Sequence, residues 1–488
     1  MDDTKGFIEY KGKTYPFSFS DFHLDLYPDN FNSRFTDEGY PSYERGDVIS
    51  SILLRGTTWD RKDVIFEVSE LYSDQDGFLS FNVSSVYEYS SIRRQYYEED
   101  GRYKHNNIKT KIMGIKISGN DVDLFYPPEK AFLKENLSDE EIISAIKVKR
   151  SAEVSLGSIV WEEKRIDFTA QYKVAERFSP EPLRSISEIT ASFSEEVPLD
   201  FVKEVYGGIM QTFKYITRRN NIAFDDIEVF DVTEKNQRYT FGKFCDLRSC
   251  IEKEQNPQMK ERVLSYNYIG EKFAELVKAF LERIIYIDHL PDNIDQVNFF
   301  GPDRMFFDFV AFERECANLY PEKTIRSEQY MEAKEKALAA MDSLIADKSG
   351  KVKKYLKAFR KRIDRDENSL EDRMLLVIND CSEIVEPFLI YELGEDYNTK
   401  VDELTPLENI ASEMNVLRND MAHGNLNIQL NKNHIAGFAI IETLLYAMRL
   451  KALGIEKRKI QEGIISIIGY KIRLDKVKKE LSGGDLHE

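Results

Sequence analysis

The chain has 488 residues, of which 42% are hydrophobic and 32% charged, so we expect a globular protein of two or three domains. Its formal net charge of −18 argues against a protein that coats duplex nucleic acid, because such binding depends on neutralising many phosphates. A local RNA site stays compatible with this charge, since cleavage of one phosphodiester needs only a positive cleft.

No apolar run reaches the roughly 18 to 20 residues of a membrane span, and the start Met-Asp-Asp-Thr-Lys does not resemble a secretory signal. We therefore expect a cytoplasmic protein without a membrane partner. The cysteines show neither the CxxC spacing of a zinc site nor the density of a disulfide framework, and we interpret them as buried small side chains. They are Cys245, Cys250, Cys316 and Cys381.

The N-terminal half has the alternating hydrophobic pattern of half-buried strands up to about residue 190. Apolar and polar side chains alternate over residues 166–174 and again over residues 79–83. Turn signals such as Gly101 divide these runs at the short spacing of a sandwich or barrel. Pro198 then introduces a helical apolar stripe from Leu199 to Ile216, which we expect to pack on the sheet, and strand-like residues follow at 227–230.

Two short patterns in this half suggest other chemistry. Residues 6–14 match the P-loop pattern GxxxxGK[ST], but a P-loop needs a strand before it and a helix after it, and here both flanks look extended. We predict a strand or hairpin that binds no nucleotide. Asp21, His23 and Asp25 alternate along one strand face, which would suit a metal-dependent enzyme or, more simply, a wet strand surface.

From about residue 265 helical periodicity replaces the strand pattern, with expected helices over residues 273–286, 304–319, 328–346 and 369–389. We predict an α+β protein with three segments: a β-rich module over residues 1–240, a connection over 241–264 and an all-α bundle over 265–488. A basic stretch at residues 348–365 is either a solvated helix face or a phosphate-contacting one. Its candidate RNA-binding residues are Lys353, Lys354, Lys357, Arg360 and Lys361.

Residues 405–425 carry the most informative pattern, TPLENIASEMNVLRNDMAHGN. Thr405, Pro406 and Glu408 supply a capping box with a first-turn proline, and Gly424 is placed to end the helix. The helix has one narrow apolar face. Arg418, Asn419 and His423 lie beside that face, in the last turns.

These three residue types suit metal-free RNA cleavage. A histidine can take the proton of a ribose 2′-hydroxyl at neutral pH, and an arginine can stabilise charge on the phosphorane. Asn419 and His423, four positions apart, share a face, so we expect the amide to bond and orient the imidazole. In a simpler alternative, Arg418 and His423 only cap carbonyl groups at the helix C-terminus, where cations are favoured.

The run from Arg418 to Gly424 resembles the RNxxxH signature of HEPN ribonucleases, and the flanking helical patterns at residues 369–389 and 434–453 fit a HEPN bundle. The β-rich half, the helix from Leu199 and the segment 306–321 extend the resemblance to the layout of ApeA-like antiphage HEPN proteins.

This resemblance implies an abortive-infection endoribonuclease, a toxin-like hydrolase in antiviral defence, that needs no metal or cofactor and leaves a cyclic phosphate. It also implies a homodimer formed through the HEPN domain. The N-terminal module would then sense a phage-derived trigger, and Asp380 is a weak candidate for an additional acidic residue. The alternative is a catalytically silent HEPN-like binding or scaffold protein whose N-terminal domain recognises a protein or nucleic-acid partner.

Overall fold

The computed structural model divides the chain into two compact units. The first comprises residues 1–214, 219–260 and 270–281, and the second comprises residues 215–218, 261–269 and 282–488. The residues that the structure describes are 4–27, 52–73, 79–128, 132–136, 144–148, 153–174, 185–247, 253–297, 299, 301–321, 328–364, 369–400, 404–425, 429–472 and 474.

The first unit begins with a closed six-stranded antiparallel barrel. Its strands follow the order β6-β3-β2-β1-β4-β5, and β5 pairs back with β6 to close the ring. They are β1 (Thr4–Tyr10), β2 (Lys13–Ser20), β3 (His23–Leu26), β4 (Ile52–Thr58), β5 (Asp63–Ser73) and β6 (Leu79–Tyr89). The predicted sandwich or barrel is therefore a barrel.

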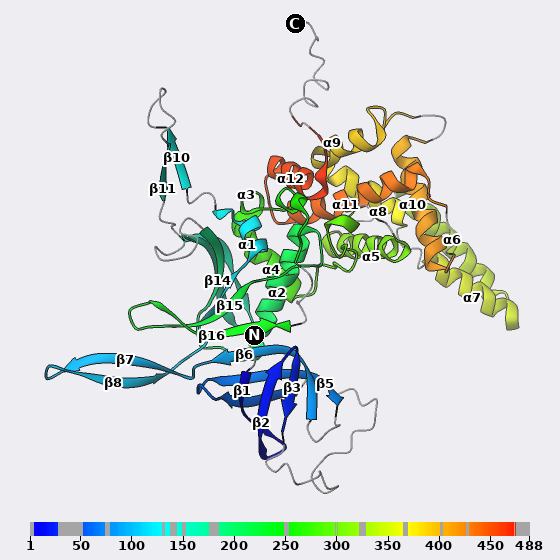
Figure 1. Cartoon of the computed structure of the whole chain (residues 1–488). Helices are drawn as coiled ribbons and strands as arrows, with labels where there is room; N and C mark the ends of the chain where they lie inside the picture. The colour runs from blue at the N-terminus through cyan, green and yellow to red at the C-terminus, as the bar shows by residue number, and fades with distance from the viewer. Residues whose placement is uncertain are drawn as a thin grey trace. The chain divides into compact units, whose positions relative to one another are not determined.

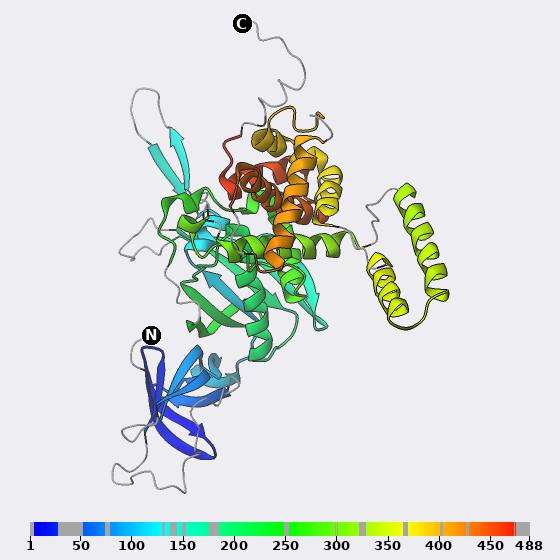
Figure 2. The same cartoon turned by 90° about the vertical axis from the view of Figure 1, so that its right-hand side faces the viewer.

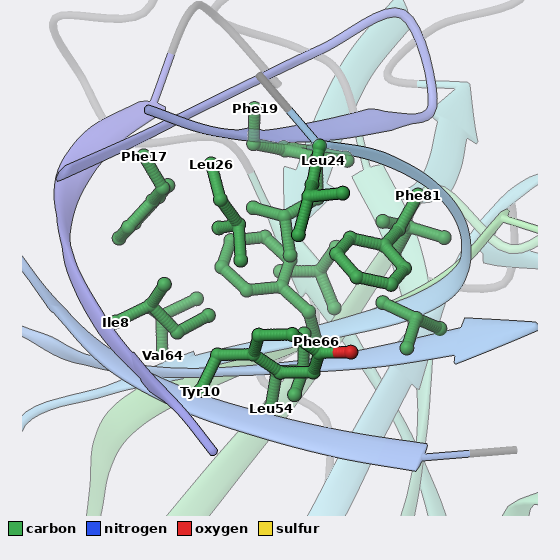
Figure 3. Close-up of a cluster of buried hydrophobic side chains, with 14 residues drawn as sticks. Ile8, Tyr10, Phe17, Phe19, Leu24, Leu26, Leu54, Val64, Phe66 and Phe81 are labelled. Atoms are coloured by element: carbon green, nitrogen blue, oxygen red, sulfur yellow. The ribbon is translucent and has the colours of Figure 1, made fainter. Parts of the chain in front are cut away.

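Alternation along the strands fills this barrel. In β1, Ile8 and Tyr10 are buried while Phe7 and Glu9 point outward. Aromatic rings from several strands meet inside, including the edge-on contact of Phe17 with Phe66 at 5.2 Å between ring centres (Figure 3). Such inward alternation is what a small closed barrel needs to fill its interior.

The P-loop-like residues 6–14 form the β1–β2 hairpin, as predicted. Lys11 and Gly12 occupy its turn with φ of 49° and 75°. No helix follows this turn, so the helix N-terminus that a P-loop uses to hold phosphate is missing at this position.

A second antiparallel layer continues from the barrel through β6, in the order β12-β13-β14-β9-β15-β16-β6. Its other strands are β9 (Gly114–Ser118), β12 (Val154–Trp161), β13 (Lys164–Val174), β14 (Ser185–Phe193), β15 (Asp226–Val232) and β16 (Arg238–Asp246). Because residues 85–89 of β6 pair with both β5 and β16, one strand belongs to the barrel and to the open sheet.

Helices pack on this sheet through aromatic side chains. They are α1 (Asn120–Phe125), α2 (Leu199–Thr217) and α4 (Phe273–Leu281), with short 3-10 turns at Pro257–Lys260 and Gly270–Lys272. Phe213 of α2 contacts both Phe125 of α1 and Phe273 of α4, with ring centres 5.9 and 6.0 Å apart. Phe201 and Tyr206 of α2 also contact Phe193 of β14 and Phe244 of β16, at 5.5 and 5.1 Å between ring centres, which confirms the predicted sheet-packed helix from Leu199.

Two further antiparallel pairs, β7–β8 and β10–β11, stand outside the large sheet (Figure 1). Their strands are β7 (Ile92–Glu99), β8 (Arg102–Lys109), β10 (Phe132–Asn136) and β11 (Ser144–Val148). Within the described residues, the two strands of each pair bond to one another and to no other strand.

The second unit is helical. Its helices are α3 (Tyr266–Ile269), α5 (Pro302–Leu319), α6 (Glu328–Ala346), α7 (Gly350–Asp364), α8 (Leu370–Asp380), α9 (Ser382–Leu393), α10 (Pro406–Ala422), α11 (Lys432–Ala452) and α12 (Lys457–Ile464), with a 3-10 turn at Ile294–Gln296 and a π-turn at Ile465–Gly469. The largely buried α11 is central to the bundle, because it packs on α5, α8, α9, α10 and α12. Among the described residues no helix is long and apolar enough to span a membrane.

Three predicted boundaries need correction. The β-rich unit extends past residue 240, since β16 runs to Asp246, and it also holds α4, whose Phe273 packs among rings of the first unit. The helix predicted over residues 273–286 ends at Leu281. The one predicted over 369–389 is two helices, because the chain turns at Cys381 between α8 and α9.

A group of buried charges lies inside the second unit. Glu442 of α11 accepts hydrogen bonds from Arg218 and, at 2.7 Å, from Arg304 of α5. Asp308, one turn along α5, is fully buried, and both of its carboxyl oxygens lack a hydrogen-bond partner among the described residues. We call Arg218, Arg304, Asp308 and Glu442 the buried charge cluster.

Candidate functional site

Helix α10 forms as its capping residues predict. The Thr405 hydroxyl accepts from the Glu408 amide at 3.1 Å, and the Glu408 carboxylate accepts from the Thr405 amide at 2.8 Å. Both bonds satisfy backbone donors that the first turn would otherwise leave unpaired. At the other end Gly424 takes φ of 77°, the left-handed conformation that glycine adopts at low cost.

The apolar face of α10 docks the helix into the bundle and leaves the candidate site at the surface. Met414 and Leu417 are buried, whereas Arg418 is half-buried and Asn419 and His423 are exposed. His423 is the C-terminal cap, and its backbone amide donates to the Asn419 carbonyl at 3.0 Å. The structure therefore places the three predicted residues together at one exposed helix end.

The side-chain bonds differ from the prediction. The Asn419 amide oxygen accepts from the Arg418 guanidinium at 3.3 Å, and among the described residues no hydrogen bond joins the Asn419 side chain to the His423 imidazole. His423 is the C-cap residue of α10, with φ of −90° and ψ of 6°, and its side chain and that of Asn419 are both exposed to solvent. Asn419 thus contacts Arg418 and not His423.

An acidic side chain that the sequence did not point to completes this group. Glu313 of α5 accepts from Arg418 at 3.0 Å, with the two side chains 26% and 35% exposed. Arg373 of α8 donates to the Glu313 backbone carbonyl at 3.1 Å, which ties that part of α5 to α8. Nothing local in the sequence marks Glu313, because the contact spans 105 positions.

Asp380, the weak candidate for this acidic role, lies elsewhere. The first residue of α8, Leu370, donates its amide to Asn415 of α10, and Asp380 is at the opposite end of that helix, about 15 Å away along the axis. There it accepts from Tyr320 and Lys451, both at 2.8 Å. It belongs to a different contact, and Glu313 takes its place beside Arg418.

The basic residues proposed to bind RNA lie on α7. Figure 2 shows α6 and α7 side by side as an antiparallel pair. Arg360 is bound to Asp342 of α6 through two hydrogen bonds of 2.6 and 3.0 Å, while Lys354, Lys357 and Lys361 are exposed and Lys353 is half-buried. Among the described residues no hydrogen bond or ion pair joins α7 to α10. The prediction for these lysines stays open.

Metal ligands do not gather in the part of the chain that the structure describes: it holds no group of three or more His, Cys, Asp or Glu side chains suited to one ion. The strand alternation of Asp21, His23 and Asp25 therefore does not build such a group. Of the cysteines, Cys316 and Cys381 are buried as expected, Cys245 is partly exposed, and Cys250 lies outside the described residues.

Chemically, the end of α10 presents one guanidinium and one imidazole at a surface. The Arg418 guanidinium has five N–H donors. Asn419 accepts from one of its terminal nitrogens and Glu313 from the other, so further N–H groups stay available for phosphate oxygens. Comparison with protein-family models, with curated proteins and with solved structures gives no match.

Proposed function

We propose that this protein is a metal-independent endoribonuclease of the HEPN type, which cleaves RNA by attack of the ribose 2′-hydroxyl. One observation carries the proposal: Arg418, Asn419 and His423 sit together on the exposed end of a docked, doubly capped helix. A helix end that only needed capping would not require a third polar side chain bonded to the arginine.

In this reaction the His423 imidazole takes the proton of the 2′-hydroxyl, whose oxygen attacks the adjacent phosphorus while the bond to the 5′-oxygen breaks, and the leaving 5′-oxygen takes a proton from water. The Arg418 guanidinium stabilises the charge that grows on the phosphoryl oxygens. The products are a 2′,3′-cyclic phosphate and a 5′-hydroxyl. Glu313 and Asn419 hold the guanidinium and act as positioning residues.

A single chain offers these groups on a surface, and a phosphodiester is better enclosed between two surfaces. We therefore propose a homodimer in which two α10 ends face one cleft, with RNA contacts added by the α7 lysines. In this proposal the first unit is the sensor of a phage-derived trigger, and cleavage of cellular or phage RNA is the abortive response.

A second candidate is a catalytically silent RNA-binding or scaffold protein. It is favoured by the bonds at the site, since Arg418 is engaged by Glu313 and the described residues give the exposed His423 imidazole no orienting hydrogen bond. An enzyme of this design would gain that orientation from a partner chain or from RNA.

The two candidates separate in one cleavage assay on a single-stranded RNA. We expect cleavage by the wild type in EDTA, cyclic phosphate ends, and no cutting of DNA of the same sequence, which lacks the nucleophile. His423→Ala should lose about 10²- to 10³-fold in rate, and Asn419→Ala less. Equal cutting of DNA, or full activity in His423→Ala, would refute the assignment.

A further inference from the structure

The β7–β8 ribbon has two faces of different composition, set by its antiparallel register. Because side chains alternate along each strand, opposite residues share a face. We call one the tyrosine face, formed by Ile92, Arg94, Tyr96, Glu98, Tyr103, His105, Asn107 and Lys109. The reverse face holds Arg93, Gln95, Tyr97, Glu99, Arg102, Lys104, Asn106 and Ile108.

The tyrosine face leaves large rings in solvent. Tyr103 is 79% exposed and Tyr96 60% exposed, and the Tyr96 ring makes an edge-to-face contact with the His105 ring opposite it, with 5.0 Å between ring centres. Rings this exposed bury little area, so they contribute little to folding beyond the cross-strand contact of Tyr96 with His105. Their position favours a role in binding.

Charge narrows the class of ligand. The tyrosine face carries two cations, Arg94 and Lys109, and one carboxylate, Glu98, a net charge of +1 in a chain whose total is −18. On the tyrosine face, no carboxylate of the described residues lies within ion-pair distance of Arg94 or Lys109. On the reverse face, Arg93 is paired with the buried Asp231 and Lys104 with Glu99.

We propose that the tyrosine face binds single-stranded RNA, with bases stacked on Tyr96 and Tyr103 and phosphates held by Arg94 and Lys109. Proteins that hold single strands combine such stacking rings with cations along the backbone. The two tyrosines are diagonal neighbours across the strands, about 7 to 8 Å apart, so each can take a different base.

A duplex fits this face less well. Its bases are already stacked on one another, and the major groove of A-form RNA is too deep and narrow for side chains to read. The ribbon belongs to the first unit and α10 to the second. Rings and cations of this kind fit any single strand, and the choice of RNA rests on the ribonuclease function proposed above.

The test is fluorescence anisotropy with a labelled 12-nucleotide single-stranded RNA and the full chain carrying His423→Ala, which keeps the probe intact. Tyr96→Ala and Tyr103→Ala should each weaken binding roughly 5- to 150-fold, the cost of one stacked base. Arg94→Ala with Lys109→Ala should lower the slope of log K against log salt by about 1.4, because each phosphate contact contributes about 0.7. Tyr97→Ala, on the reverse face, is the matched control and should change the affinity less than twofold.

Unchanged affinity in the Tyr96 and Tyr103 variants would overturn the proposal, as would equal loss in Tyr97→Ala or equal binding of duplex RNA. Circular dichroism of each variant tests that the first unit is still folded, and loss of binding in a folded Tyr103→Ala chain supports the proposal. Binding without cleavage by the wild type would leave the ribbon assignment standing and refute the ribonuclease. Cleavage with unchanged binding by the ribbon variants would do the reverse.

Discussion

The second unit holds two groups of charged side chains, one buried and one partly exposed to solvent. In the buried charge cluster, Arg218 and Arg304 share the carboxylate of Glu442, and all three side chains are at most 10% exposed. At the end of α10, Arg418 and Glu313 are paired at 3.0 Å but are 35% and 26% exposed. Buried ions must keep their partners, whereas partly exposed ions can exchange them for water or a ligand.

The buried charge cluster is suited to a structural role, and the charged side chains at the end of α10 are suited to a chemical one. Burial alone would raise the pKa of Glu442, yet the two guanidinium groups beside it hold that pKa below its ordinary value. This carboxylate therefore stays ionised and paired with Arg218 and Arg304. The ion pair at the end of α10 is more exposed and therefore weaker. We expect variants there to change activity and variants in the buried charge cluster to change stability.

The largest expected effect is on stability, from Glu442→Gln. It removes the carboxylate that accepts from Arg218 and Arg304 and leaves Asp308 as the acidic side chain of the cluster; breaking a buried pair costs up to about 3 to 5 kcal/mol. Urea unfolding of the full chain, followed by circular dichroism, measures the change. Glu313→Gln is the matched control and should cost less than about 1 kcal/mol, since its pair is partly exposed. A similar loss of unfolding free energy in the two variants would contradict the distinction between buried and partly exposed pairs.

Arg418→Ala should lower the rate of RNA cleavage and leave the stability nearly unchanged. Loss of one donor that stabilises the charged transition state typically lowers the rate about 10²- to 10³-fold, while the free energy of unfolding should shift by less than about 1 kcal/mol. RNA cleavage rates and urea curves on the same preparation give both numbers. An inactive variant that also unfolds early would mean that Arg418 serves the bundle.

A smaller effect is expected from the titration of Asp308. Burial, and then Glu442, raise the pKa of this carboxyl well above its ordinary value, against the pull of Arg304 and Arg218. A carboxyl whose folded pKa lies above its unfolded value of about 4 favours the folded state most at low pH. That contribution is lost as the pH rises from about 4 through the folded pKa.

Asp308→Asn removes this titration, so the variant's stability should fall less than that of the wild type between pH 5 and the folded pKa. Thermal unfolding over a pH series is the measurement. Identical pH profiles for the two chains would mean that Asp308 is ionised inside the cluster and compensated by the arginines.

The smallest effect is expected at the start of α10. Thr405→Ala removes the side-chain acceptor of the capping box and should cost about 1 kcal/mol. Thr405→Ser keeps the hydroxyl and should cost less. Because the cap lies at the opposite end of α10 from Arg418, cleavage rates at a temperature where both chains are folded should stay unchanged. A rate loss would show that the cap influences the site.

The features of this protein that depend on neighbouring residues in the sequence could be predicted. The capping box gave α10 its start at Pro406, and period-two alternation gave the β-rich half. Long-range contacts were not predictable: no local pattern joins Glu313 to Arg418, or closes β5 onto β6. The turn at Cys381 was missed because apolar residues on both sides keep a helical period through it.

The shared strand β6 limits how the first unit can be dissected. Its residues 79–82 pair with β3 and its residues 80–83 with β5, while its residues 85–89 pair with both β5 and β16. A fragment ending at Tyr89 would contain every barrel strand, yet it would expose the edge that β16 covers, and open edges of this kind promote aggregation. The amide hydrogens of β6 should accordingly be among the slowest in the unit to exchange with solvent, because releasing them requires barrel and sheet to open together.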